Sequence, residues 1–213
     1  MRIVEFFKQL SSEGIEGLFA YKYAEFARTS VSMQLYQQIA TDVAQYIQSG
    51  RILEIGPGPG SISIEIAKRL PQVETVGLDA SSTMVEIASC NAEEAQVADR
   101  VTFQIGNASQ MPFPAESFDF VVSNGSLHEW KEPVKILNGV YDVLRNGGMA
   151  RISDLRRDAP DELKHELAGQ IDSLVMRWGL RKSFAEAYTC AEIPGLLAET
   201  AFPDHEIREN GVS

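Results

Sequence analysis

The sequence predicts an open, doubly wound α/β sheet whose strands are mostly parallel. Two observations support this fold class. Between residues 51 and 154, short apolar runs alternate with stretches in which apolar residues recur at helical spacing. The connections are short, and a strand joined to the next strand through a helix lies parallel to it, with a right-handed crossover. We expect strands at 51–56, 73–79, 101–106, 118–124 and 148–154, and helices at 61–70, 81–97 and 133–148.

Helical segments are expected on both sides of this alternation. Apolar residues recur every three or four positions near the N-terminus, which predicts helices at 16–27 and 32–48. We expect a single domain over residues 1–213. Its parts are N-terminal cap helices (1–49), a core (50–154), a helical insertion after the fifth strand (155–190), and a last helix with a short strand at 205–209 (191–213).

The charge balance narrows the class of partner. Nineteen basic against thirty acidic side chains give a formal net charge of −11. Such a surface repels phosphate backbones and anionic lipid, so we expect a small-molecule partner and neither nucleic acid nor a membrane. The sequence has no apolar run long enough to span a bilayer. The oligomeric state is left open.

Cysteine and histidine usage predicts a reducing compartment and no metal site. Cys90 and Cys190 lie far apart in the sequence and fit neither a disulfide framework nor a metal knuckle. The three histidines lack the spacing of metal ligands. We therefore expect a reduced, cytoplasmic protein.

A glycine-rich loop follows the first predicted strand. It reads GPGPG over residues 56–60. Gly56, Gly58 and Gly60 allow sharp turns and the close approach of a ligand, because no Cβ intervenes. The helix that follows directs its positive N-terminal end to the same place, and open parallel sheets bind ligands beyond the carboxyl ends of their strands. The loop predicts a ligand site, with a plain turn as the alternative.

Asp79 ends the second predicted strand, 79 − 60 = 19 residues after the last loop glycine. A carboxylate at this spacing can accept both ribose hydroxyls of an adenosine. The alternative is a cap for the helix that begins near Ser81. Together with the loop, Asp79 predicts an adenosine-containing cofactor, a class that includes the nicotinamide dinucleotides.

The pattern of the loop distinguishes between such cofactors. It reads E-x-G-x-G-x-G, with Glu54 two residues before Gly56, and differs from both the G-x-G-x-x-G of dinucleotide sites and the phosphate loop that ends in G-K-[ST]. A carboxylate beside the loop repels a pyrophosphate, attracts an ammonium and tolerates a sulfonium.

At this point the chain resembles the class I S-adenosyl-L-methionine-dependent methyltransferases, and within them the small-molecule branch that includes ubiquinone- and menaquinone-biosynthesis enzymes. The matching segments cover about half of the chain: LEIGPGPG (53–60), GLDAS (77–81), GNASQMPFP (106–114), SFDFVVSNGSLHEW (117–130) and VLRNGGMARISD (143–154). The resemblance implies a Rossmann-like class I methyltransferase fold. It also implies in-line methyl transfer from S-adenosyl-L-methionine to a small acceptor, with S-adenosyl-L-homocysteine as product.

The resemblance further implies which residues bind the cofactor. Glu54 and the glycine loop would hold the methionine part, and Asp79 would bind the ribose. The other implied contacts are Ala80 and Met84 along the adenosine, Asn107 and Ala108 at the adenine edge, and Asn124 through its backbone at the methionyl end. Tyr23, on the first predicted helix, is a candidate to close over the cofactor carboxylate, with simple helix packing as the alternative.

His128 is the candidate catalytic residue. It follows the fourth predicted strand in the sequence SLHEW, beside the expected methyl group, where it could serve as a general base. Plain packing beneath the cap is the alternative. Trp130 is a candidate wall of the acceptor site, and Arg156, with its neighbour Arg157, could clamp an anionic substrate. The alternative for the arginines is ion pairing with Asp154 or Asp158.

Two other functions stay open at this point. A nicotinamide-dependent oxidoreductase would share the loop and Asp79, and an S-adenosylmethionine-binding protein without methyltransferase activity would keep all the cofactor motifs. The resemblance also implies a seven-stranded sheet, yet almost nothing follows residues 205–209. We expect either a polypeptide that continues beyond Ser213 or an unpaired sheet edge.

Overall fold

The centre of the protein is a five-stranded sheet. The computed structural model describes residues 15–209, 211 and 212, so residues 1–14 of the predicted cap lie outside the described residues. All strands are parallel, in the order β3-β2-β1-β4-β5, which confirms the predicted fold class. The strands are β1 (Ser49–Ile55), β2 (Gln72–Asp79), β3 (Val101–Ile105), β4 (Phe118–Asn124) and β5 (Leu144–Ser153).

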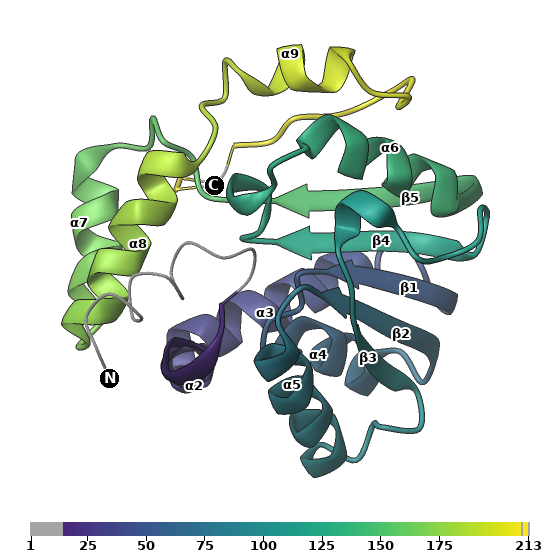
Figure 1. Cartoon of the computed structure of the whole chain (residues 1–213), viewed down its shortest axis with the longest axis horizontal. Helices are drawn as coiled ribbons and strands as arrows, with labels where there is room; N and C mark the ends of the chain where they lie inside the picture. The colour runs from purple at the N-terminus through teal and green to yellow at the C-terminus, as the bar shows by residue number, and fades with distance from the viewer. Residues whose placement is uncertain (1–14, 210, 213) are drawn as a thin grey trace.

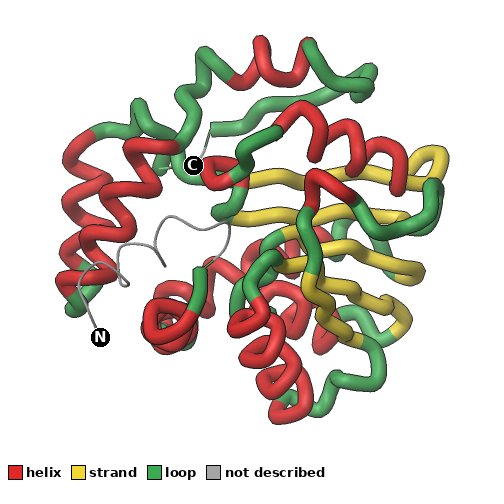
Figure 2. The backbone as a smooth tube through the Cα atoms, viewed as in Figure 1, coloured by secondary structure: helices red, strands yellow, loops and turns green. Residues whose placement is uncertain are grey.

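Helices cover both faces of this sheet (Figures 1 and 2). The helices α3 (Ser30–Val43), α4 (Ser61–Arg69) and α5 (Ser82–Glu94) lie on one face, and α6 (Pro133–Val143) lies on the other. Alternate strand residues point to opposite faces. Accordingly, Ile52 and Val122 pack in the cluster formed with α3 and α4, whereas Leu53 and Val121 pack in the cluster formed with α6.

The helices of the insertion lie toward the carboxyl ends of the strands. The arrowheads of β4 and β5 point to the side where α7 (Asp161–Gly169) and α8 (Leu174–Glu186) lie (Figure 1). Phe19 of α2 (Gly17–Ala27) packs there with Ile171 and Met176 of the insertion. The last helix, α9 (Ile193–Ala198), has Pro194 in its first turn, where a missing N–H is tolerated. No helix in the described part of the chain is long and apolar enough to cross a membrane.

The boundary between α6 and β5 differs from the prediction. The helix was expected to run to residue 148, but it ends at Val143, and β5 begins at once with Leu144. Leu144 pairs with Phe118 and Met149 with Phe120, so an irregularity in the ladder takes up the intervening residues. Gly147 has a φ of +80° there, a conformation that favours glycine. Pairing with β4 therefore outweighs the helical pattern.

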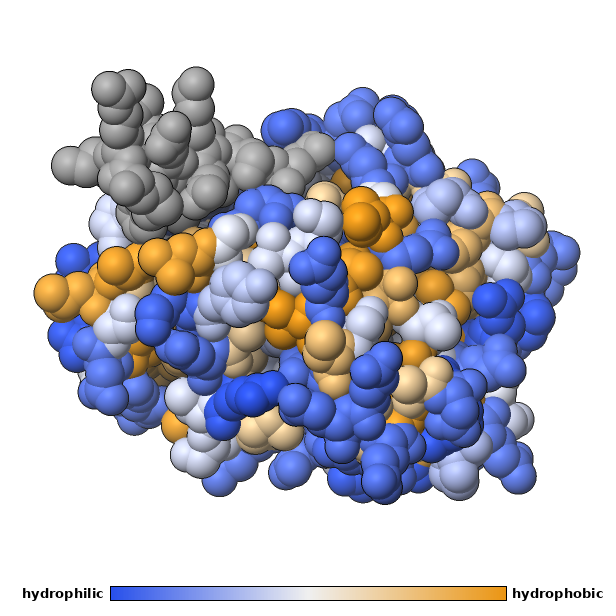
Figure 3. All heavy atoms as spheres, turned by 60° about the horizontal axis from the view of Figure 1, so that its bottom comes forward, coloured by the Kyte–Doolittle hydropathy of each residue, from blue (hydrophilic) through white to orange (hydrophobic). Residues whose placement is uncertain are grey.

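The predicted strand at 205–209 is wrong. These residues belong to neither a strand nor a helix, and all of them are exposed. His205, Glu206, Arg208 and Glu209 are polar, and Arg208 pairs with Glu206 at 2.8 Å instead of joining a ladder. Among the described residues, β5 is thus an edge of the sheet. The face in Figure 3 is largely hydrophilic, with separate apolar groups.

Candidate functional site

The glycine loop joins β1 to α4 at the carboxyl end of the sheet. Gly56, Gly58 and Gly60 have φ values of +66°, +52° and +79°, so all three adopt the left-handed backbone that the sequence predicted for a tight turn. A Cβ on Gly60 would stand 2.5 Å from Cζ of Phe103, and packing there excludes any side chain. A Cβ on Gly58 would meet only the ring of Tyr23, at 3.6 Å.

Asp79 connects the loop to the start of α5. Its carboxylate accepts hydrogen bonds from the Gly58 N–H at 3.0 Å and from the Ser81 N–H at 2.9 Å. Burial raises the pKa of Asp79, and these two bonds offset part of that rise. The side-chain cap of α5 is Ser81, whose Oγ accepts from the Met84 N–H at 3.0 Å. Asp79 therefore does not cap the helix, and its two oxygens keep lone pairs for other donors.

Glu54 is a fully buried carboxyl, 1% exposed. It accepts hydrogen bonds from the N–H of Ser63, at 3.0 Å, and from the Ser63 hydroxyl. Burial raises its pKa to about 7, against the effect of both Ser63 bonds. Glu54 thus fixes the first turn of α4 and, through it, the end of the glycine loop. Its predicted contact with the methionine part of a cofactor stays a prediction.

The other predicted cofactor residues lie around the same edge. Ala80 is exposed beside Asp79, whereas Met84 is buried in α5. The Asn107 side chain accepts from the Ser109 N–H at 2.8 Å and begins the short 3-10 helix η1 (Ala108–Gln110). Asn124, at the end of β4, accepts from the Ser153 hydroxyl at 2.9 Å. Their roles in ligand binding stay predictions.

His128 and Asp154 form a buried pair at the ends of β4 and β5. Nδ1 of His128 lies 2.9 Å from both carboxylate oxygens, and the His128 N–H donates to the same carboxylate at 2.7 Å. Their side chains are only 6% and 7% exposed. Burial lowers the pKa of His128, but the hydrogen bond and charge of Asp154 outweigh it, so the net shift is upward. The carboxylate fixes the orientation of the ring and leaves Nε2 as the proton-accepting atom.

Asp154 was expected only as a partner for the arginines, not for His128. The available signal was its place directly after the fifth strand, since the carboxyl ends of neighbouring parallel strands meet at one edge. The neighbouring Glu129 is an exposed residue, yet desolvation by the surrounding protein raises the pKa of its carboxyl, against the charges of His128 and Lys182.

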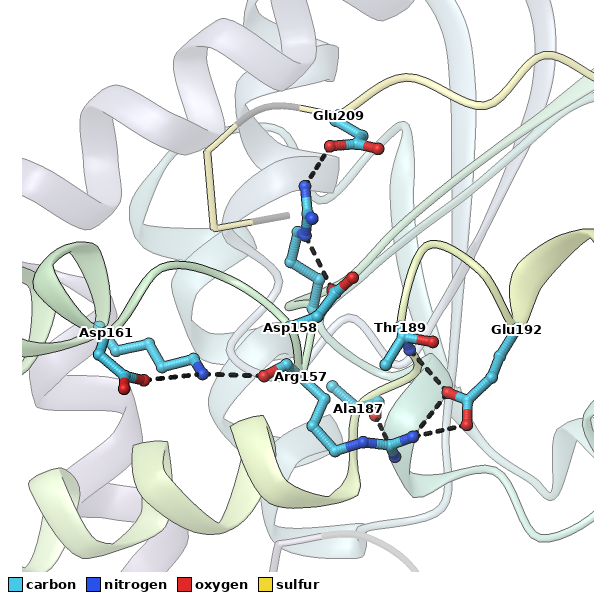
Figure 4. Close-up of polar contacts among 9 residues, drawn as sticks. Arg157, Asp158, Asp161, Ala187, Thr189, Glu192 and Glu209 are labelled. Atoms are coloured by element: carbon cyan, nitrogen blue, oxygen red, sulfur yellow. Dashed lines mark hydrogen bonds and ion pairs between the residues drawn. The ribbon is translucent and has the colours of Figure 1, made fainter.

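Ion pairs hold both Arg156 and Arg157, and Figure 4 shows Arg157 with Glu192 and Ala187. Arg156 pairs with Asp158 at 3.0 Å and with Glu209 near the C-terminus. Arg157 pairs with Glu192 at 2.6 Å, and its guanidinium also donates to the Ala187 carbonyl at 2.9 Å. The alternative of ion pairing is therefore the arrangement observed, with Asp158 and not Asp154. Substrate binding by Arg156 stays a prediction.

Two aromatic candidates lie in different surroundings. The Tyr23 ring lies near Gly58, 3.6 Å from where a Cβ on that glycine would stand, and it packs against the cluster of Phe19, Ile171 and Met176. Trp130 is half-buried against the core beneath α6. The predicted contact of Tyr23 with the cofactor carboxylate and the predicted role of Trp130 as a wall of the acceptor site stay predictions. Among the described residues, no group of His, Cys, Asp and Glu could hold a metal ion.

Comparison with known proteins agrees with this geometry. A family model described as a methyltransferase domain matches residues 48–191, more than half of the chain. The chain belongs to this methyltransferase domain family. The match spans β1, the glycine loop, Asp79 and the His128–Asp154 pair. It does not favour the oxidoreductase alternative.

Individual proteins show how similar this chain is to known methyltransferases. Erythromycin 3''-O-methyltransferase of Saccharopolyspora erythraea is 28% identical over 83% of this chain and 58% of its own length. Demethylmenaquinone methyltransferase of Lactiplantibacillus plantarum is 34% identical over 54% of this chain and 48% of its own. The chain thus spans less than two thirds of either relative. A solved S-adenosylmethionine-dependent methyltransferase from Aquifex aeolicus shares the fold, with a TM-score of 0.70 at 16% identity, over 92% of this chain and 94% of its own.

Proposed function

We propose that this protein binds S-adenosyl-L-methionine and transfers its methyl group in line to a small-molecule acceptor. The observation that carries the proposal is the glycine loop joined to Asp79, in a chain of the methyltransferase domain family. The loop supplies close backbone approach, and the Asp79 carboxylate supplies an acceptor for ribose hydroxyls. The main contribution of the protein to methyl transfer is to align the acceptor with the bond from sulfur to the methyl carbon.

We assign general-base catalysis to His128. Its Nδ1 faces the Asp154 carboxylate, so the ring presents Nε2 to an acceptor whose hydroxyl or carbon acid must lose a proton. The imidazolium formed when Nε2 takes that proton is stabilised by Asp154. The charge balance supports a small acceptor over nucleic acid, since a net charge of −11 repels a phosphate backbone.

Two calorimetric titrations test the cofactor. The purified chain is titrated with S-adenosyl-L-homocysteine and, separately, with NAD. We expect saturable binding of the homocysteine product and none of NAD. Binding of NAD alone would reject the proposal in favour of the oxidoreductase.

Transfer of a labelled methyl group tests the reaction. The wild-type chain and a His128→Gln variant are incubated with methyl-labelled S-adenosylmethionine and a small-molecule extract, and labelled products are separated by chromatography. We expect label in a small product with the wild type and at least tenfold less with the variant, at equal cofactor affinity. Cofactor binding without labelled product would instead support an S-adenosylmethionine-binding protein that lacks methyltransferase activity.

The compartment is a separate inference. Both cysteines are free, and they lie on α5 and next to α9, so they do not face one another for a disulfide. We infer a reducing, cytoplasmic location from this usage of cysteine.

A further inference from the structure

The helix α2 lies between α5 and the insertion that carries α7 and α8 (Figure 1). Polar contacts at its two ends join it to α5, and an apolar contact near its first turn joins it to the insertion. The helix therefore touches the elements around the cofactor site and the insertion at the same time.

The start of α2 is fastened to the first turn of α5. The Glu16 carboxylate, directly before α2, accepts from the Ser82 N–H at 2.8 Å and from the Thr83 hydroxyl. The Ser81 Oγ donates to the carbonyl that precedes Glu16, at 2.6 Å, while the Ser81 N–H donates to Asp79. The segment that begins α2 and the carboxylate expected at the ribose thus share one support.

The end of α2 is fastened to α5 and, through it, to the glycine loop. Arg28, directly after α2, donates from Nη2 to Oδ1 of Asn91 at 2.6 Å. Asn91 donates from Nδ2 to the Pro59 carbonyl of the loop at 2.8 Å. Because an arginine side chain only donates, the Asn91 oxygen faces Arg28 and its NH₂ group faces the loop. Both ends of α2 are therefore tied to segments that the cofactor would contact.

The apolar side of α2 holds the insertion. Phe19 packs with Ile171 and Met176, and a Cβ on Gly179 of α8 would stand 3.2 Å from Cζ of Phe19. Among the described residues, α7 has no buried side chain, and α8 buries only Met176 and Phe184. A segment with so few buried apolar contacts has a low local stability, so its order depends on the packing with Phe19.

We propose that α2 couples the cofactor site to the insertion, so that a bound cofactor stabilises α7 and α8. The inference rests on the proposed function. A cofactor that holds the glycine loop and Asp79 in one arrangement also holds the ends of α2, and with them Phe19 against the insertion. Such coupling is reciprocal, so an ordered insertion favours the cofactor to the same degree. Because α8 contacts the short 3-10 helix η2 (Leu127–Glu129), which carries His128, we expect the cofactor to bind before the acceptor.

Hydrogen exchange of the full chain, measured by mass spectrometry with and without saturating S-adenosyl-L-homocysteine, tests the coupling. In the wild type, we expect slower exchange in peptides from residues 54–66, which report binding at the glycine loop. Exchange in peptides from α7 and α8 should slow as well, by about threefold or more.

Two substitutions break the fastening at the start of α2 from opposite sides. Glu16→Ala removes the carboxylate, and Thr83→Val removes the hydroxyl that donates to it. Each variant should keep the slower exchange at the glycine loop and lose it in α7 and α8. The affinity for the homocysteine should fall by no more than the factor by which α7 and α8 were protected. Glu25→Gln is the control, because it alters only the exposed pair with Lys22 on α2, and it should behave as the wild type.

Two results would overturn the inference. One is slower exchange at the glycine loop of the wild type without any change in α7 and α8. The other is protection of α7 and α8 that persists in either Glu16→Ala or Thr83→Val. A wild-type chain in which the homocysteine slows exchange nowhere would reject the proposed function itself, and this coupling with it.

Discussion

Replacement of Asp154 by Asn tests the buried pair at the ends of β4 and β5. The carboxylate accepts from Nδ1 and the N–H of His128 and from the Leu155 N–H at 2.7 Å. Asn keeps the shape and removes the charge. Burial lowers the pKa of His128, whereas Asp154, Glu129 and Glu186 raise it, so we expect the variant ring, which loses the charge of Asp154, to titrate below the wild-type ring.

The size of the shift follows from the charge that the substitution removes. A hydrogen bond to a charged group contributes about 1.5–3 kcal/mol, so loss of the carboxylate should destabilise the charged imidazolium by about that much and lower the pKa of His128. The general base works when neutral, so the rising limb of the rate against pH should move to lower pH. Positioning of the ring is weakened at the same time, and the plateau of the rate should fall as well.

The pH dependence of folding stability should also reveal the His128–Asp154 pair. The pKa of His128 is raised on folding, so the stability that the pair contributes is fully present below the ordinary pKa of 6.5 and is lost as pH rises through the folded value. The excess stability of wild type over Asp154→Asn should therefore shrink as pH increases through that window, in urea unfolding at several pH values.

Nuclear magnetic resonance of the imidazole protons provides the direct assay. The chain has three histidines, and the signals of the exposed His165 and His205 serve as internal references for the comparison. If His128 titrates at the same pH in wild type and in Asp154→Asn, the carboxylate is not the cause of the shift, and our account of the pair is refuted.

Three further substitutions test the loop and the sheet. Asp79→Ala should weaken binding of S-adenosyl-L-homocysteine at least tenfold, about 1.4 kcal/mol, by calorimetry; unchanged affinity would argue against the ribose contact. Gly60→Ala should lower the free energy of unfolding in urea by about 2–4 kcal/mol, since φ is +79° and Phe103 blocks a Cβ. Gly195→Ala is the control, because Gly195 has open space around it, and it should not destabilise the protein. Thr75→Val should be neutral or stabilising by about 1 kcal/mol, because Oγ1 of Thr75 is buried without a partner among the described residues; a clear loss would indicate a hidden partner.

Local sequence signals predicted what depends on local chemistry. The alternation of apolar runs predicted the five strands, and the glycines of GPGPG predicted the sharp turns of the loop. The boundary of α6 failed because pairing of Leu144 with Phe118 is a long-range contact, invisible to a helical pattern. The strand at 205–209 failed for the related reason that a strand requires a neighbour, and no pattern of side chains supplies one.

The residues of the candidate site likewise fall into those predicted from local spacing and those that depend on long-range contacts. The loop glycines and Asp79 follow from spacing, and the structure joins them through the Gly58 N–H. The pairing of His128 with Asp154 requires that β4 and β5 be neighbours, and their separation in the sequence hides it. Asp158 was a predicted alternative partner of Arg156, whereas Glu209 was hidden, since it comes from the far end of the chain.

The irregular start of β5 has a consequence for association between molecules. An unpaired, regular edge strand offers its backbone as a template to which a strand of another chain can add. Here the ladder shifts between Phe118 and Phe120, and the arginines of β5 are tied inward, Arg145 to Asp119 at 2.7 Å and Arg151 to Asp42 at 3.4 Å. An incoming strand would meet an irregular backbone flanked by charged side chains that ion pairs hold in place. Among the described residues, these features of β5 therefore disfavour the addition of further strands and growth into a fibre.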